Sequence, residues 1–130
     1  LGQPEAFFER MGLWFDLPGQ GFKTTPEQPE PTRSDCHGWG AHPLYHYFAS
    51  LLGVRPAGFG FERVAIAPMP GHLTALSGTL PHPQGPIEVA LNFRGAHASG
   101  TVTLPGEICG TLRFAGKALD LQPGTQTIDL

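Results

Sequence analysis

Charged residues are scarce in this chain, and their scarcity argues against several kinds of partner. Only 15% of the 130 residues are Asp, Glu, Lys or Arg, against roughly 25% in ordinary globular domains. The eight Lys and Arg residues do not cluster, whereas nucleic acids and anionic membranes bind concentrated positive patches. No apolar run approaches the roughly 18 residues that span a bilayer. We therefore expect neither a nucleic acid nor a membrane as a partner.

Cysteine is scarce as well, and no metal-binding pattern is present. Cys36 and Cys109 are far apart and fit no metal-ligand spacing. We expect two free thiols, with a disulfide between them as the less favoured alternative. His42 and His46 are close enough on a helix to share one metal ion, but no third ligand accompanies them. The sequence therefore predicts neither a metal site nor a cofactor.

Glycine and proline are abundant, with 18 and 14 residues. The hydrophobic residues, 40% of the chain, fall in alternating runs, which indicates many turns rather than disorder. The chain begins Leu-Gly-Gln-Pro, with neither Met nor a signal-peptide pattern. We expect a piece of a longer protein, and the sequence does not indicate whether that protein is cytoplasmic or secreted.

Two helices are predicted in the first part of the chain. Residues 4–15 carry large apolar side chains at helical spacing; these are Phe7, Phe8, Met11, Trp14 and Phe15. A second helix fits residues 43–52, with Pro43 suited to its start and Gly53 to its end. Residues 55–58, Arg-Pro-Ala-Gly, are typical of a linker.

After Gly60 the hydrophobic period changes from helical spacing to two, which is typical of strands. Seven short strands are predicted at residues 62–68, 72–80, 87–93, 100–105, 110–114, 117–121 and 125–130. Strands of this length separated by turns indicate an antiparallel sandwich. The residues expected in its core are Val64, Ile66, Ile87, Val89, Leu91, Phe93, Val102, Leu104, Leu112 and Phe114.

The segment PTRSDCHGWGAHPLYHYFASLLGVRPAGFGFERVAIAP, residues 31–68, closely resembles the end of the catalytic barrel in bacterial α-L-rhamnosidase-like glycoside hydrolases. Its specific part is the Arg-Ser-Asp-Cys-His-x-Trp run followed by His-Pro and a helix. The resemblance covers roughly residues 13–68. It implies a mainly β chain, in which residues 1–56 are the last hairpin and active-site loop of an α/α barrel. Residues 57–130 are then the C-terminal antiparallel β-sandwich.

The resemblance also implies an inverting hydrolase acting on terminal α-L-rhamnose in glycosides. In such enzymes a carboxylic acid protonates the leaving oxygen and a second carboxylate activates water. A Thr-Thr loop of the family supplies the base, and Thr24-Thr25-Pro26-Glu27 here makes Glu27 the candidate. The family has one more residue before the glutamate, so Glu30 stays the alternative. In the non-catalytic interpretation, both glutamates are solvated loop residues.

His37 and Trp39 are the candidate substrate-binding residues. His37 can donate a hydrogen bond to a sugar hydroxyl, or it can be a helix-start residue bonded to the backbone. Trp39 can form an apolar wall for the sugar or pack in the core, and packing is slightly favoured. Asp35 is expected as a helix cap or supporting partner, with Arg33 as its ion-pair mate.

The implied partner is a rhamnose-containing carbohydrate. We expect the chain alone to be inactive, because it lacks the general acid and most of the barrel. The alternative function is a non-catalytic carbohydrate-binding or structural β-sandwich. The apolar first helix, separated from the barrel helices that would cover it, is expected to cause self-association.

Overall fold

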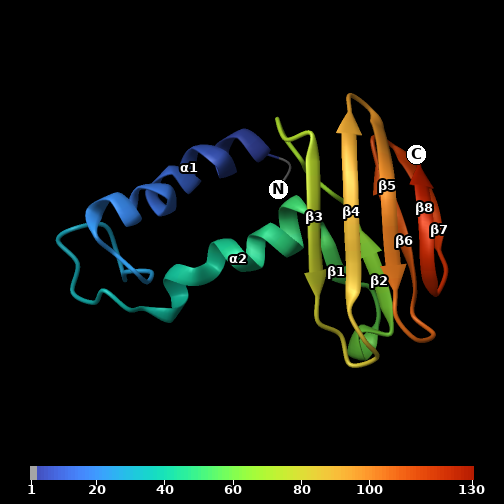
Figure 1. The fold of residues 1–130 in the computed structure, drawn as a ribbon, viewed down its shortest axis with the longest axis horizontal. Coiled ribbons are helices and arrows are strands. Elements are labelled where there is room, and N and C mark those ends of the chain that lie inside the picture. The colour runs from blue at the N-terminus through green and yellow to red at the C-terminus, as the bar shows by residue number, and fades with distance from the viewer. Residues whose placement is uncertain (1–2) are drawn as a thin grey trace. The chain divides into compact units, whose positions relative to one another are not determined.

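The computed structural model describes residues 3–130, and their contacts divide the chain into two compact units (Figure 1). The first unit is Leu1–His46 and the second is Tyr47–Leu130. The predicted division at residue 56 therefore differs from the structural one. The contacts change ten residues earlier, between His46 and Tyr47, within the second helical stretch.

The first unit contains the predicted first helix, α1 (Pro4–Asp16). Pro4 occupies its first turn, where the missing N–H costs no helical hydrogen bond. The short 3-10 helix η1 (Pro18–Gln20) follows and ends at Gly21, whose φ is 90°. A loop then leads to the 3-10 turn η2 (Gly38–Ala41). In the described structure no residue of α1 is buried, so the helix keeps its apolar side chains at least partly exposed.

The second predicted helix is confirmed, but it is not a regular α-helix throughout. It begins as α2 (His42–His46) and continues as a π-helical segment, η3 (Tyr47–Leu51). Gly53, with a φ of 76°, follows its end as predicted. Leu51 and Leu52 are buried, whereas Leu44 is 66% exposed. Only the later part of this helical stretch therefore contributes to a core.

The second unit is a sandwich of two four-stranded sheets, seen one behind the other in Figure 1. One sheet has the order β1 (Val54–Pro56), β2 (Arg63–Ile66), β6 (Cys109–Phe114) and β7 (Lys117–Leu121). The other has the order β3 (Ala75–Leu80), β4 (Ile87–Arg94), β5 (His97–Leu104) and β8 (Gly124–Asp129). Neighbouring strands are antiparallel except β2 and β6, which are parallel. All seven predicted strands are present.

The linker prediction for residues 55–58 is wrong at its start, because Val54–Pro56 is strand β1. Val54 pairs with Ile66 and Pro56 with Val64, so β1 forms an edge of its sheet. The side chain of Arg55 reaches back, and its Nε donates to the carbonyl of Ala49 at 2.5 Å. An edge strand tolerates Pro56 because one side of its backbone needs no partner strand.

The predicted core is confirmed at nine of its ten positions. Strand β4 alternates strictly, with Ile87, Val89, Leu91 and Phe93 buried between exposed neighbours. A register slip of one residue would expose all four, so their burial specifies the register. Burying each such side chain stabilises the fold by about 1.5–3 kcal/mol. Phe114 differs from the prediction, since it is half-buried at the end of β6 and packs against Phe93 at a ring distance of 5.2 Å.

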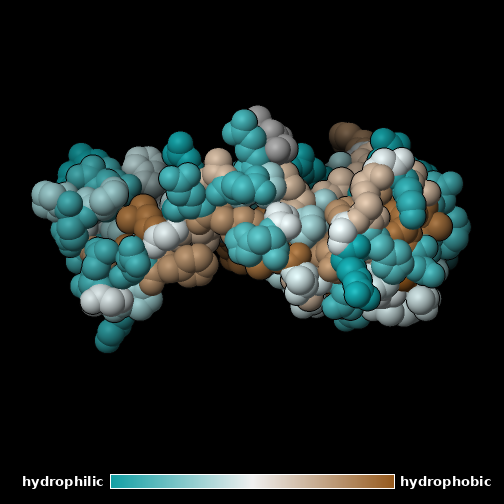
Figure 2. All heavy atoms as spheres, turned by 90° about the horizontal axis from the view of Figure 1, so that it is seen from above, coloured by the Kyte–Doolittle hydropathy of each residue, from teal (hydrophilic) through white to brown (hydrophobic). Residues whose placement is uncertain are grey.

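Several apolar side chains remain at the surface, and Figure 2 shows brown patches among the teal polar residues. The exposed large apolar residues of the described chain are Phe15, Trp39, Leu44, Tyr45 and Phe59. Neither helix within residues 3–130 combines the length and the apolar composition needed to cross a membrane. Cys36 and Cys109 are both free thiols, as predicted.

Gly53 joins the end of η3 to the sandwich at a very short distance from β2. Its carbonyl accepts a hydrogen bond from the N–H of Ala67 at 3.0 Å. A Cβ at Gly53 would lie 2.1 Å from the carbonyl oxygen of Ala67, far inside van der Waals contact. This backbone approach requires glycine for space as well as for its positive φ.

We expect Gly53→Ala to lower the free energy of unfolding by more than about 2 kcal/mol, because strain and a backbone clash add. Gly95→Ala is the matched control, since Gly95 has a φ of 60° and open space around its Cβ. Gly95→Ala should lower the free energy of unfolding only by the cost of the left-handed conformation, about 1–2 kcal/mol. Equilibrium urea unfolding measures both values. Equal losses of unfolding free energy in the two variants would show that the backbone near Ala67 moves away from the new Cβ without an energetic cost.

Candidate functional site

The loop between α1 and η2 folds back on itself, and backbone hydrogen bonds join its two ends. The N–H of His37 donates to the carbonyl of Thr25 at 2.8 Å, and the N–H of Glu27 donates to Ser34 at 2.9 Å. Thr25 Oγ1 donates to the carbonyl of His37 at 3.0 Å, and Thr24 Oγ1 donates to that of Asp35. The residues of the Thr-Thr loop therefore lie beside those of the Arg-Ser-Asp-Cys-His run.

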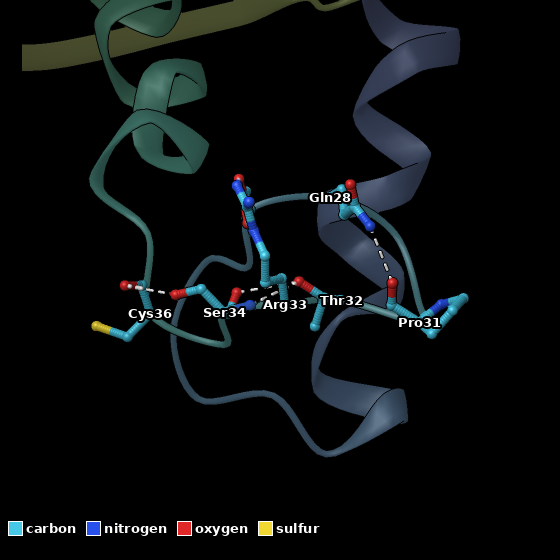
Figure 3. A network of polar contacts seen from close by, with 7 residues as sticks. Gln28, Pro31, Thr32, Arg33, Ser34 and Cys36 are labelled. Atoms are coloured by element: carbon cyan, nitrogen blue, oxygen red, sulfur yellow. Dashed lines mark hydrogen bonds and ion pairs between the residues drawn. The ribbon is translucent and has the colours of Figure 1, made fainter.

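Short-range polar contacts order the tip of this loop (Figure 3). Gln28 Nε2 donates to the carbonyl of Pro31 at 2.9 Å, and Thr32 Oγ1 donates to that of Ser34 at 3.1 Å. Ser34 Oγ in turn donates to the carbonyl of Cys36 at 3.3 Å. Each contact spans two or three residues, so the loop is held by side chains where no helix or strand holds it.

A pocket of about 340 Å³ lies between the loop and α1, entirely within the first unit. Its lining residues are Leu13, Trp14, Leu17, Pro26, Glu27, Gln28, Pro29, Trp39, Gly40 and His42. The volume is at the lower end of the range for small-molecule sites, about 300–1,000 Å³. Its mainly apolar wall with few polar groups is the composition of such sites.

Gly40 allows the loop and η2 to approach closely beside this pocket. It is buried, and a Cβ there would lie 2.6 Å from the carbonyl oxygen of Pro26. The indole N–H of Trp14 donates to the carbonyl of Gly40 at 2.7 Å, which ties α1 to the same point. Gly38, two residues earlier, has open space around its Cβ position, so the close approach is confined to Gly40.

Glu27 lies in the pocket wall with its carboxylate held by Arg33. Arg33 Nε donates to Glu27 Oε2 at 2.8 Å, and Arg33 Nη2 donates to Oε1. The side chain of Glu27 is only 8% exposed, whereas that of Arg33 is 80% exposed. These hydrogen bonds lower the pKa of Glu27; desolvation opposes the shift and the charge of His37 adds to it. Glu27 is therefore ionised at neutral pH.

The predicted ion-pair partner of Arg33 is wrong. We expected Asp35 as its ion-pair mate, but the folded-back loop places Arg33 against Glu27 instead. The same contact raises the pKa of Arg33. Asp35 is exposed, and in the described chain the N-cap residue of η2 is His37, with no side-chain capping hydrogen bond. The capping prediction for Asp35 is therefore wrong as well.

Glu30, the alternative base, lies outside the pocket lining. It is exposed, and its carboxylate accepts the backbone N–H of Thr32 at 2.8 Å. This contact is local to the loop tip. The structure thus separates the two glutamates, with Glu27 in the pocket wall and Glu30 in solvent.

His37 and Trp39 are brought together, with ring centroids 4.1 Å apart and planes tilted by 42°. His37 is half-buried and uses its backbone to bind Thr25. Trp39 is 64% exposed, so core packing, the slightly favoured interpretation, is wrong for the described chain. Trp39 instead contributes to the pocket wall near Glu27.

Two residues of the pocket were not assigned to a site from the sequence. His42 is considered there only as a metal ligand, and Trp14 only as one of the large apolar side chains of the first helix. The rings of Trp14 and His42 contact edge to face at 5.0 Å, and His42 Nδ1 lies 2.9 Å from the carbonyl oxygen of Trp39. The aromatic spacing of the sequence contained no signal for this tertiary contact. Among residues 3–130, no three His, Cys, Asp or Glu side chains gather as metal ligands.

Two stacked, mainly antiparallel sheets define the second unit as a β-sandwich. The sequence profile of the family described as the bacterial alpha-L-rhamnosidase C-terminal domain matches residues 53–128, more than half of the chain. The chain therefore belongs to this family of rhamnosidase C-terminal domains. No curated protein matches the chain in sequence.

Solved α-L-rhamnosidase structures share the fold. The enzyme from Aspergillus terreus is 18% identical over 90% of this chain, with a TM-score of 0.73. That from Dictyoglumus thermophilum is 14% identical over 87%, with a TM-score of 0.71. The enzyme from Streptomyces avermitilis, complexed with L-rhamnose, is 18% identical over 79%, with a TM-score of 0.64. The chain spans only 15%, 16% and 12% of these proteins, respectively.

We expect Trp14→Phe to destabilise the first unit by about 0.5–1.5 kcal/mol, because the variant loses the hydrogen bond to Gly40. Trp39→Phe is the matched control, since Trp39 is largely exposed and its replacement should have little effect on stability. Urea unfolding followed at the far-UV helical signal measures both variants. Equal midpoints would contradict a stabilising role for the Trp14 indole.

Proposed function

We propose that the chain is part of a longer glycoside hydrolase that releases terminal α-L-rhamnose with inversion, and that Glu27 is its general base. The observation that carries this proposal is the position of Glu27. Glu27 has a nearly buried, ionised side chain and lines the same pocket as Trp39. The resemblance of the surrounding loop to rhamnosidase active-site loops and the family of the sandwich support the same assignment.

An ionised carboxylate in such a pocket can take a proton from water as the water attacks the anomeric carbon. Inversion needs a second carboxyl group about 6.5–9.5 Å away, protonated and placed on the leaving-group side. Within residues 3–130 the other glutamate of the loop, Glu30, points into solvent and is outside the pocket lining. We therefore assign the general acid to another part of the longer protein, and expect the isolated chain not to turn over substrate.

His37 and Trp39 are proposed as substrate-binding residues on the same side of the loop. Rhamnose is a 6-deoxy sugar, so its site needs hydrogen-bond donors for the hydroxyls and an apolar surface for the methyl group. The exposed ring of Trp39 offers that surface, and it contacts the imidazole of His37 in a tilted arrangement. His37 is held through its backbone by Thr25, which leaves the imidazole to serve the sugar.

We expect Glu27→Gln in the full-length protein to lower kcat by about 10²–10⁴-fold, because the amide keeps the shape but cannot take the proton. The affinity for rhamnose should change little. Steady-state kinetics with an aryl α-L-rhamnoside measure the first quantity, and calorimetric titration with rhamnose measures the second. Glu30→Gln is the matched control in the same loop and should retain turnover.

The opposite pattern, with Glu30→Gln inactive and Glu27→Gln active, would transfer the base role to Glu30. A full-length protein that binds rhamnose but never hydrolyses a rhamnoside would reject the enzyme proposal in favour of a binding module.

We also propose that the isolated chain associates with a second copy through α1. The helix contains no buried residue in the described structure, and Phe15 is 73% exposed. A contiguous apolar surface of more than a few hundred Å² usually leads to association, and burial of one large side chain is worth about 1.5–3 kcal/mol. Such a dimer would reflect the separation of the chain from its longer protein.

Sedimentation velocity across a range of concentrations should therefore show a monomer–dimer equilibrium for the isolated chain. Phe15→Glu should shift it to the monomer, because a charge cannot be buried cheaply in an apolar interface. Phe59→Glu is the matched control, since Phe59 is 96% exposed but lies in the sandwich unit. A monomeric chain at all concentrations, or equal effects of the two variants, would count against association through α1.

A further inference from the structure

Arg33 contacts Glu27 through a two-pronged arrangement that restricts the carboxylate in both position and plane. The Nε and Nη2 groups each donate to a different carboxylate oxygen. Because the guanidinium is planar, two parallel hydrogen bonds align it with the carboxylate plane. A lysine could supply the charge but not this alignment.

The contact still leaves Glu27 able to act as a base. An ionised carboxylate has about four acceptor positions, and Arg33 uses two of them. The remaining two lie in the same plane on the outer sides of the oxygens, so their direction is set by Arg33. Glu27 lines the pocket, which is the side from which water and sugar would approach.

The residues on either side of Arg33 are hydrogen-bonded to each other. Thr32 and Ser34 are joined by hydrogen bonds at 3.1 and 3.3 Å, and the guanidinium extends away from them (Figure 3). The N–H of Glu27 donates to the carbonyl of Ser34, one residue beyond Arg33. The two partners of the ion pair are therefore held at neighbouring points of one folded-back loop.

The other titratable groups near Glu27 are few. His37, on the returning strand of the loop, favours the ionised carboxylate through its charge. His42, from α2, lines the same pocket and is engaged with the carbonyl of Trp39. The residues that α1 contributes to the pocket wall, Leu13 and Trp14, carry no charge. Arg33 is thus the strongest electrostatic influence on Glu27.

We infer that Arg33 is a positioning residue, which fixes the carboxylate of Glu27 toward the pocket and keeps it ionised in acidic solution. The inference rests on the proposed role of Glu27 as general base. Its chemical consequence is a base that works below the pH at which an isolated glutamate would be protonated. Arg33 therefore makes the carboxylate of Glu27 a weaker base, because an Arg-bound carboxylate attracts a proton less strongly. The same contact keeps the carboxylate charged over a wider range of pH.

The sign of the pH effect follows from the direction of the shift. The pKa of Glu27 is lowered from an ordinary value of 4.5, so the active, ionised form persists as the pH falls past 4.5. The ion pair also contributes to stability above that pH, and the contribution disappears as the pH falls through the lowered pKa. Removal of Arg33 should therefore move the acid limb of activity to higher pH.

The test compares Arg33→Met and Arg33→Lys with the unmodified full-length protein, using kcat/KM for an aryl α-L-rhamnoside as a function of pH. Arg33→Met should move the acid limb to higher pH and lower the plateau by about 10–100-fold, since the base is misplaced as well as less ionised. Arg33→Lys retains the charge, so its acid limb should move less while its plateau still falls. Arg113→Met is the control, because Arg113 is exposed in β6 of the sandwich.

A second measurement separates this inference from the function of Glu27. The carboxyl carbon of Glu27 can be followed by ¹³C NMR in the 130-residue chain, and its titration midpoint should rise in Arg33→Met. An unchanged midpoint, or a lower plateau with the acid limb in place, would overturn the inference about Arg33. A raised midpoint together with full turnover in Glu27→Gln would instead uphold the contact and overturn the assignment of Glu27 as base.

Discussion

The candidate site depends on the pairing between Thr25 and His37. Two hydrogen bonds form it: the N–H of His37 donates to the carbonyl of Thr25, and the hydroxyl of Thr25 donates to the carbonyl of His37. Thr25 and His37 are 12 positions apart in the sequence, and their hydrogen bonds offset part of the entropy lost in ordering the loop between them. Together with the hydrogen bond from Glu27 to Ser34, it keeps Glu27 and Trp39 in one folded-back loop, although neither lies in a long helix or a strand.

The sandwich could be predicted from the sequence because its signal is local and repeated. In β4 four buried residues alternate with exposed ones, and such a pattern fits one register only. Strand β1 could not be predicted in the same way. It has only three residues and ends in Pro56. Its pairing with Val64–Ile66 is a tertiary contact, and three residues are too few to show an alternating hydrophobic pattern.

The site residues could be proposed from the sequence, but their contacts could not. Arg33 lies two residues from Asp35 and six from Glu27, and sequence distance favoured the wrong acid. The returning loop decides the pairing, because the backbone hydrogen bond from Glu27 to Ser34 brings the more distant carboxylate to Arg33. Trp39 illustrates the same limit, since its exposure depends on which surfaces surround η2 rather than on its own neighbours in the chain.

The arrangement of the ion pair also suits a carboxylate that must stay charged while it is largely withdrawn from water. Burying both members of a salt bridge removes two charges from water, and their attraction often fails to offset that cost. Here only Glu27 is withdrawn from solvent, at 8% exposure, while Arg33 remains 80% exposed. The guanidinium keeps most of its hydration and replaces the water that the carboxylate has lost. A charged base can thus occupy a mainly apolar pocket wall, provided that the loop keeps Arg33 on its outer side.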